Sequence, residues 1–127
     1  MRDIIIITNH KDRFAPFVQA LRGEPDYAVG WKDSLKESPD RTSATPPALM
    51  VIDEEVDGIS NLQIARQIVM KNPMINLALV SNLSGKDFHE ASEGLGILAQ
   101  LPQDPGKEDA AKLVKLLGKI LSPWAPG

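Results

Sequence analysis

The chain has 127 residues, 43% of them hydrophobic and 24% charged, which is typical of one globular domain with a single core. It contains no cysteine, so disulfides, thiolate metal ligands and cysteine nucleophiles are excluded and a reducing compartment is expected. The net charge is -3 and no basic run occurs, which argues against a nucleic-acid partner. The longest apolar run is too short to cross a bilayer, and the N-terminus lacks the pattern of a signal peptide. We therefore expect a cytoplasmic protein with no membrane partner.

Five short apolar segments predict buried strands. Each is apolar almost throughout rather than alternating, as in a strand of a parallel sheet that is covered on both faces. They occupy residues 3–8, 27–31, 48–52, 75–80 and 97–101.

The segment after the first strand predicts a helix. Phe14, Phe17, Val18 and Leu21 recur at the spacing of one helical face. Asp12 is a suitable N-cap for this helix, which should end at residue 23.

Residues 32–47 do not continue the alternation of strand and helix. Leu35 is the only large apolar residue before the prolines at 46 and 47, and Pro39 interrupts the rest. We expect a degenerate second helix here, reduced to a short turn followed by loop.

Three later segments have clear helix starts. Ser60 should cap a helix with a buried stripe, and Ser84 begins a capping-box pattern with Asp87. Asp104 and Pro105 are suitable for the N-cap and first position of the last helix. The stripe after Ser60 comprises Leu62, Ala65, Ile68 and Val69, and the last helix has Ala110, Leu113, Val114, Leu117, Ile120 and Leu121.

This alternation predicts an α/β fold: a flavodoxin-like, doubly wound, five-stranded parallel sheet in the order 2-1-3-4-5. The domain should span residues 1–121, with 122–127 as a tail or the start of a linker. In such a sheet the ligand crevice opens at the carboxyl ends of strands one and three. Asp53, Glu54 and Glu55 directly follow the third predicted strand, and so are expected beside that crevice.

Three of the predicted strands end in a telling set of residues: Asp53 follows strand three, Ser81 follows strand four, and Leu101-Pro102 ends strand five. With this spacing the chain resembles, over nearly its whole length, a receiver domain of two-component response regulators, the CheY-like family. The resemblance implies that Asp53 is the phosphoacceptor and that Ser81 contacts the phosphoryl group. It also implies a cis bond before Pro102, which X-Pro bonds adopt at small cost.

Other positions depart from the family pattern. The two acids that end strand one in receivers appear here as Thr8 and Asn9, the conserved lysine as Leu101, and the aromatic switch residue as Leu98. Magnesium would then depend on Asp53, with Asn9 and the main-chain carbonyl of Glu55 as weak additional ligands. Since magnesium favours carboxylate oxygens in strict octahedral geometry, these losses predict weak or absent binding. The pattern therefore favours a divergent receiver, or pseudo-receiver.

Three functions are compatible with this pattern. We favour a non-enzymatic signalling module that acts by protein–protein contact, without efficient phosphorylation. The family resemblance implies a contact surface on the fourth helix, fifth strand and fifth helix, for a histidine kinase, an effector or a second copy. Here that surface includes Leu98, Lys112, Lys115 and Lys119.

The alternative is an intact phosphorelay receiver, with Asp53 phosphorylated by a histidine kinase. A more remote alternative is a flavin-type binder on the same fold. Residues 8–13, which follow strand one, contain no glycine for a phosphate-cradling loop, and this disfavours the flavin hypothesis.

Overall fold

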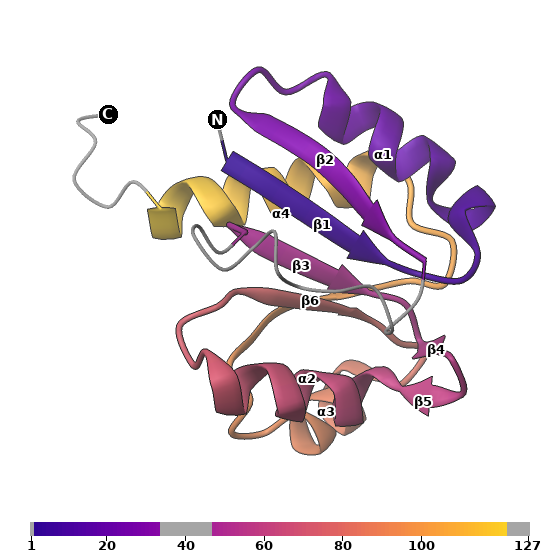
Figure 1. Ribbon diagram of the computed structural model, residues 1–127, viewed down its shortest axis with the longest axis vertical. Helices are drawn as coiled ribbons and strands as arrows, with labels where there is room; N and C mark the ends of the chain where they lie inside the picture. The colour runs from indigo at the N-terminus through magenta and orange to yellow at the C-terminus, as the bar shows by residue number, and fades with distance from the viewer. Residues whose placement is uncertain (1, 34–46, 122–127) are drawn as a thin grey trace.

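A five-stranded parallel sheet forms the centre of the molecule (Figure 1). The computed structural model describes residues 2–33 and 47–121, so the expected degenerate helix and the C-terminal tail lie outside the described residues. The strand order is β2-β1-β3-β6-β7, which confirms the predicted 2-1-3-4-5 order. The strands are β1 (Arg2–Ile7), β2 (Tyr27–Lys32), β3 (Leu49–Ile52), β6 (Leu77–Val80) and β7 (Ile97–Leu101).

Helices cover both faces of the sheet. A 3-10 helix, η1 (Lys11–Phe14), leads directly into α1 (Ala15–Arg22), which packs with α4 (Lys107–Leu121) over one face (Figure 1). On the other face lie α2 (Asn61–Lys71) and α3 (Gly85–Ala91). Within the described part of the chain, no helix is long and apolar enough to cross a membrane.

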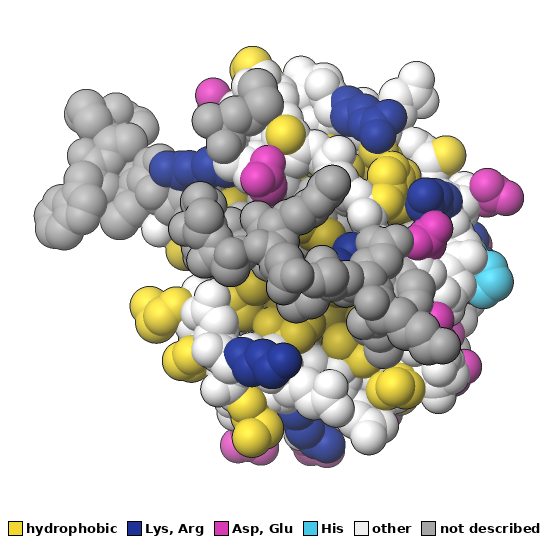
Figure 2. Space-filling model, viewed as in Figure 1, with side chains coloured by type: hydrophobic (Ala, Val, Ile, Leu, Met, Phe, Trp, Pro, Cys, Tyr) yellow, Lys and Arg dark blue, Asp and Glu magenta, His cyan; other side chains and the backbone are white. Residues whose placement is uncertain are grey.

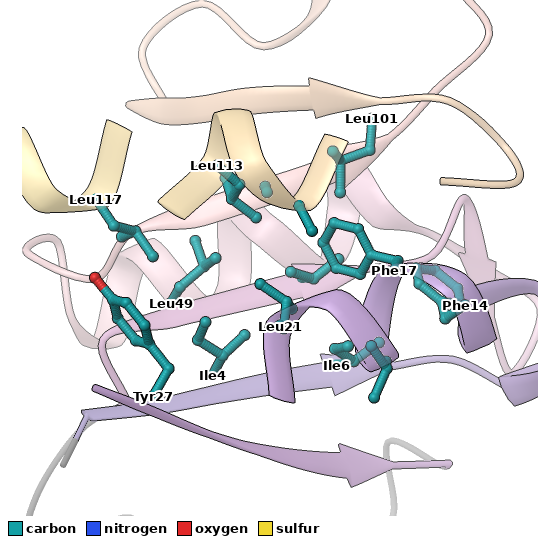
Figure 3. Close-up of a cluster of buried hydrophobic side chains, with 14 of the residues drawn as sticks. Ile4, Ile6, Phe14, Phe17, Leu21, Tyr27, Leu49, Leu101, Leu113 and Leu117 are labelled. Carbon is teal, nitrogen blue, oxygen red and sulfur yellow. The ribbon is translucent and has the colours of Figure 1, made fainter. Parts of the chain in front are cut away.

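The core is divided by the sheet into two clusters. Ile4 and Ile6 of β1 belong to the cluster under α1 and α4, where they meet Phe17 and Leu113 (Figure 3). Ile7 belongs to the cluster under α2 and α3. Since successive strand residues point to opposite faces and both faces are covered, β1 is apolar at each position of Ile4–Ile7, whereas Arg2 and Asp3 at its start are exposed.

The helix starts agree only in part with the sequence predictions. Ser60 and Ser84 are confirmed as N-caps, because their hydroxyls accept hydrogen bonds from the Gln63 and Asp87 N–H groups. Asp12 is wrong as an N-cap: it lies inside η1, which follows His10.

The last helix begins at Lys107, later than predicted from Asp104 and Pro105. Gly106 is its N-cap, because its carbonyl accepts the Ala110 N–H at 3.2 Å. The Asp109 carboxylate accepts the Gly106 N–H at 2.8 Å, which is half of a capping box. This contact fixes the helix start two residues beyond Pro105.

A small β-hairpin between β3 and α2 was not predicted. Its strands are β4 (Glu55–Val56) and β5 (Ile59–Ser60), paired antiparallel. The turn residues Asp57 and Gly58 both have positive φ, 54° and 79°. An Asp-Gly pair is a strong signal for such a two-residue turn. The hairpin is anchored by Val56, which is fully buried in the α2 and α3 cluster.

Candidate functional site

Asp53 lies where the fold is expected to place a site, at the carboxyl edge of the sheet. It directly follows β3, and its N–H donates to the Ile7 carbonyl of β1 at 2.9 Å. The residue is nevertheless only 2% exposed. The carboxylate is therefore at the expected position but shielded from solvent.

Protein donors bind both oxygens of the Asp53 carboxylate. The Thr8 hydroxyl donates to Oδ2 at 2.5 Å, and the Glu54 N–H donates to Oδ1 at 2.7 Å. Thr8 is fully buried, and its Oγ1 also accepts the His10 N–H at 2.9 Å. Hydrogen bonds to a carboxylate are about twice as strong as neutral ones. At one of the two positions where receivers carry an acid, this chain thus has a hydroxyl group that donates a hydrogen bond to the Asp53 carboxylate.

Asn9 ties three segments together. Its Nδ2 donates to the Asp33 carbonyl at 2.8 Å, and to the Asp57 carboxylate at 3.2 Å. Its Oδ1 accepts the Asp57 N–H at 2.8 Å. The carbonyl oxygen that was expected to offer itself to magnesium is thus engaged by the turn of the β4–β5 hairpin.

The two glutamates after Asp53 differ in environment. Glu54 is half-buried, and its carboxylate accepts a hydrogen bond from Gln103 Nε2 at 3.2 Å. The Glu54 main-chain carbonyl accepts the Asn61 N–H at 3.1 Å. Glu55 is exposed on β4. The three consecutive acids therefore do not converge on one point.

Ser81 continues from β6, as predicted, and its N–H donates to the Leu101 carbonyl at 2.9 Å. Its hydroxyl oxygen accepts the Leu83 N–H at 3.1 Å. Gln100 Nε2 donates to the main-chain carbonyls of Ser81 and Leu83 at 3.2 and 2.8 Å. The segment after β6 is therefore held by its own serine and by a side chain of β7.

The end of β7 differs from the expectation in one respect. Leu101, at the expected lysine position, is 3% exposed and packs in the core cluster under α1 and α4. The predicted cis bond before Pro102 is wrong, because none of the peptide bonds within residues 2–33 and 47–121 is cis. The trans isomer is the lower-energy form, and the turn after β7 closes without the other one. Leu98, at the switch position, is half-buried against the same cluster.

Asn61 is a buried polar residue that was not singled out from the sequence. It is 5% exposed, and its Nδ2 donates to the Val80 and Ile52 carbonyls at 2.7 and 3.4 Å. It therefore links the carboxyl ends of β3 and β6. A signal was available, since Asn61, Ile64, Ala65 and Ile68 share the spacing of one helical face.

The arrangement does not suit the magnesium ion that the resemblance implies. Among the residues that the structure describes, no three His, Cys, Asp or Glu side chains gather as a metal site. The Asp53 oxygens already accept hydrogen bonds from Thr8 and Glu54, and the Asn9 carbonyl oxygen accepts one from Asp57. Magnesium requires near-octahedral oxygen ligands, which would have to be released from these donors first.

Comparison with solved structures identifies the fold. A response regulator receiver domain protein from Clostridium thermocellum matches with a TM-score of 0.75 and 13% identity, over 95% of this chain and 98% of that one. The chain has the receiver fold. A LuxR-family two-component response regulator from an Aurantimonas species matches at 0.73 and 19% identity, over 95% and 85% of the two chains. The chemotaxis response regulator CheY4 of Vibrio cholerae matches at 0.75 and 9% identity, over 92% and 98%.

The other two comparisons found nothing: no family model matches the sequence, and no curated protein matches it. At 9 to 19% identity, the structural neighbours share the receiver fold. The residues of the site must then be judged on their own chemistry.

Proposed function

We propose that this receiver fold serves as a signalling module that works by protein–protein contact, without magnesium-dependent phosphorylation of Asp53. One observation carries the proposal: Asp53 is 2% exposed, with one carboxylate oxygen bound by the Thr8 hydroxyl and the other by the Glu54 N–H. A phosphoryl donor must reach a carboxylate oxygen, and a cation must offset the negative charge that accumulates.

The surroundings of Asp53 lack the charges that phosphoryl transfer needs. Thr8 and Asn9 replace the acid pair that would hold magnesium, and Leu101 replaces the lysine that would bind the phosphoryl oxygens. Leu101 is buried among apolar side chains. The Ser81 hydroxyl could still turn toward a phosphoryl group, but it now accepts the Leu83 N–H. These features favour a module whose single conformation does not depend on phosphorylation over a phosphorelay receiver.

The proposed contact surface consists of α3, β7 and α4, which correspond to the fourth helix, fifth strand and fifth helix expected from the sequence. On α4 the side chains of Lys112, Lys115 and Lys119 are exposed, and Leu116 and Ile120 are 37% and 45% exposed. Apolar side chains among positive charges suit a partner whose surface is apolar at its centre and acidic at its rim. The partner can be a kinase, an effector or a second copy of the chain.

The test is a titration with beryllofluoride and magnesium, followed by NMR of backbone amides, with Asp53→Asn as the control. We expect no saturable change at the carboxyl edge of the wild-type sheet, and the same association state by sedimentation with and without the two reagents. Incubation with acetyl phosphate and magnesium should leave the intact mass unchanged. Saturable shifts that vanish in Asp53→Asn, or an added phosphoryl mass, would establish the phosphorelay alternative instead.

The surface has its own control. Replacing both Lys112 and Lys115 by glutamate should abolish pairing of the protein with its partner through α4. It should have little effect on thermal stability, because both side chains are exposed. Pairing that survives the double substitution excludes this surface.

A further inference from the structure

We propose that the β4–β5 hairpin is a latch over Asp53 and that the Asn9 side chain holds it closed. The proposal rests on the function proposed above, because it concerns access to the same carboxylate. It assigns Asn9 a role as a positioning residue: it binds the hairpin turn through its carboxamide, at a position where a receiver would carry a metal-binding acid.

The hairpin is too small to hold itself in place. Its two strands have two residues each, and an isolated two-stranded hairpin is marginally stable at best in water. Its position must therefore come from contacts with the rest of the domain. At one point the contact is Val56, fully buried among the side chains under α2 and α3.

Asn9 supplies the contact at the turn. Its carboxamide bonds both the N–H and the carboxylate of Asp57, at 2.8 and 3.2 Å, and the Asp33 carbonyl after β2 at 2.8 Å. These three bonds join the ends of β1 and β2 to the tip of the hairpin. They also hold Asp57 at a φ of 54°, in the left-handed region that a non-glycine residue adopts at some cost.

The connection from the hairpin to Asp53 runs through Glu54. Its N–H caps Asp53 Oδ1 at 2.7 Å, and the next residue begins β4. Glu54 is also held by two other hydrogen bonds: its carboxylate accepts one from Gln103 Nε2, and its main-chain carbonyl accepts one from the Asn61 N–H. If the hairpin swings out, Glu54 must change its backbone conformation. The Asp53 oxygen then loses its main-chain donor and becomes open to solvent.

The same geometry predicts the effect of an acid at position 9. Asn9→Asp would lose both Nδ2 donors and set a second carboxylate against that of Asp57, now 3.2 Å from Asn9 Nδ2. Like charges this close repel each other. An acid at position 9 is therefore expected to open the latch rather than to build a metal site beneath it.

The experiment compares wild type, Asn9→Ala and Asn9→Asp, with Asn82→Ala, an exposed asparagine at the same edge, as the matched control. Hydrogen exchange by mass spectrometry reads the hairpin amides, and carbodiimide labelling of carboxylates reads access to Asp53. Both Asn9 variants should speed exchange in residues 55–60 by about tenfold or more and leave α2 unchanged, since only local opening is altered. Labelling of Asp53 should rise at least severalfold, and neither readout should change in Asn82→Ala.

Unchanged exchange in residues 55–60 of Asn9→Ala overturns the role of Asn9. Faster exchange with Asp53 labelled as slowly as before overturns the latch. If the Asn9 variants do not fold, Gly58→Ala replaces them. Its new Cβ meets nothing within 4 Å, but the φ of 79° strains any residue with a side chain, so the hairpin should loosen at the same turn without any change to Asn9.

These readouts are independent of phosphorylation. Phosphorylation of the wild-type chain would overturn the proposed function whatever the hairpin amides do. Unchanged labelling of Asp53 in an opened hairpin would overturn only the latch.

Discussion

The pair formed by Thr8 and Asp53 allows a quantitative prediction for Thr8→Val. Valine keeps the branched shape of threonine but removes a hydroxyl that makes two hydrogen bonds, 2.5 Å to Asp53 Oδ2 and 2.9 Å from the His10 N–H. A hydrogen bond to a charged group contributes about 1.5–3 kcal/mol, and a neutral one about 0.5–1.5 kcal/mol. Thr8 and Asp53 are 0% and 2% exposed, so water cannot easily replace the hydroxyl. We expect the free energy of unfolding to fall by roughly 2–4 kcal/mol.

Urea unfolding at pH 7 measures this loss, with Thr8→Ser as the matched control. Serine keeps the hydroxyl and loses one buried methyl group, which should cost about 1 kcal/mol. The interaction itself is isolated by repeating Thr8→Val in an Asp53→Leu background, where the hydroxyl has no carboxylate to bind. There only the bond from the His10 N–H is lost, so the cost should fall to about 0.5–1.5 kcal/mol. If Thr8→Val costs less than Thr8→Ser, or costs the same in both backgrounds, the hydroxyl is not what stabilises buried Asp53.

Two further predictions concern residues away from the carboxylate. Asn61→Leu leaves the buried Val80 and Ile52 carbonyls without their side-chain donor, so it should lower the free energy of unfolding by about 1–3 kcal/mol. In the same urea assay the control Gln63→Leu, on the exposed face of α2, should change it by less than about 0.5 kcal/mol. Burial raises the pKa of the Tyr27 phenol above 10.0, and the nearby Arg2 charge offsets this only in part. The stability linked to this neutral phenol is complete below the unfolded pKa and is lost as pH rises through the folded one, so thermal unfolding above pH 10 should be less pH-dependent in Tyr27→Phe. Tyr27 is the chain's one tyrosine, so ultraviolet absorbance follows its ionisation directly, and a titration midpoint at or below 10.0 contradicts the prediction.

The strands were predictable because β1, β3 and β6 are buried on both faces. Burial on both faces favours apolar residues at successive positions, so an unbroken apolar run such as Ile4–Ile7 indicates a buried strand. The alternation with amphipathic helices predicted a doubly wound α/β fold, and the strand order was the one expected of its five-stranded flavodoxin-like type. The position of Asp53 at the carboxyl edge followed from the order.

The chemistry of the site was less predictable, because it depends on contacts between distant residues. Thr8 and Asp53 are 45 positions apart, and nothing in either local pattern indicates that the hydroxyl points at the carboxylate. The isomer before Pro102 rests on a free-energy difference of about 0.5–1 kcal/mol, smaller than sequence reasoning resolves. The hairpin is different: Asp57-Gly58 was a readable turn signal, but two-residue strands give no hydrophobic period to accompany it.

The carboxamides of Asn9, Asn61, Gln100 and Gln103 have a consequence for the conditions in which this edge keeps its shape. Together they connect the strand ends, the hairpin and Glu54, and every bond they make has at least one uncharged partner. Attraction between two full charges at a surface weakens as dissolved salt screens it, whereas short bonds made by neutral amides are screened far less. The edge should therefore keep its shape over a wider range of salt concentration than an edge held by ion pairs would.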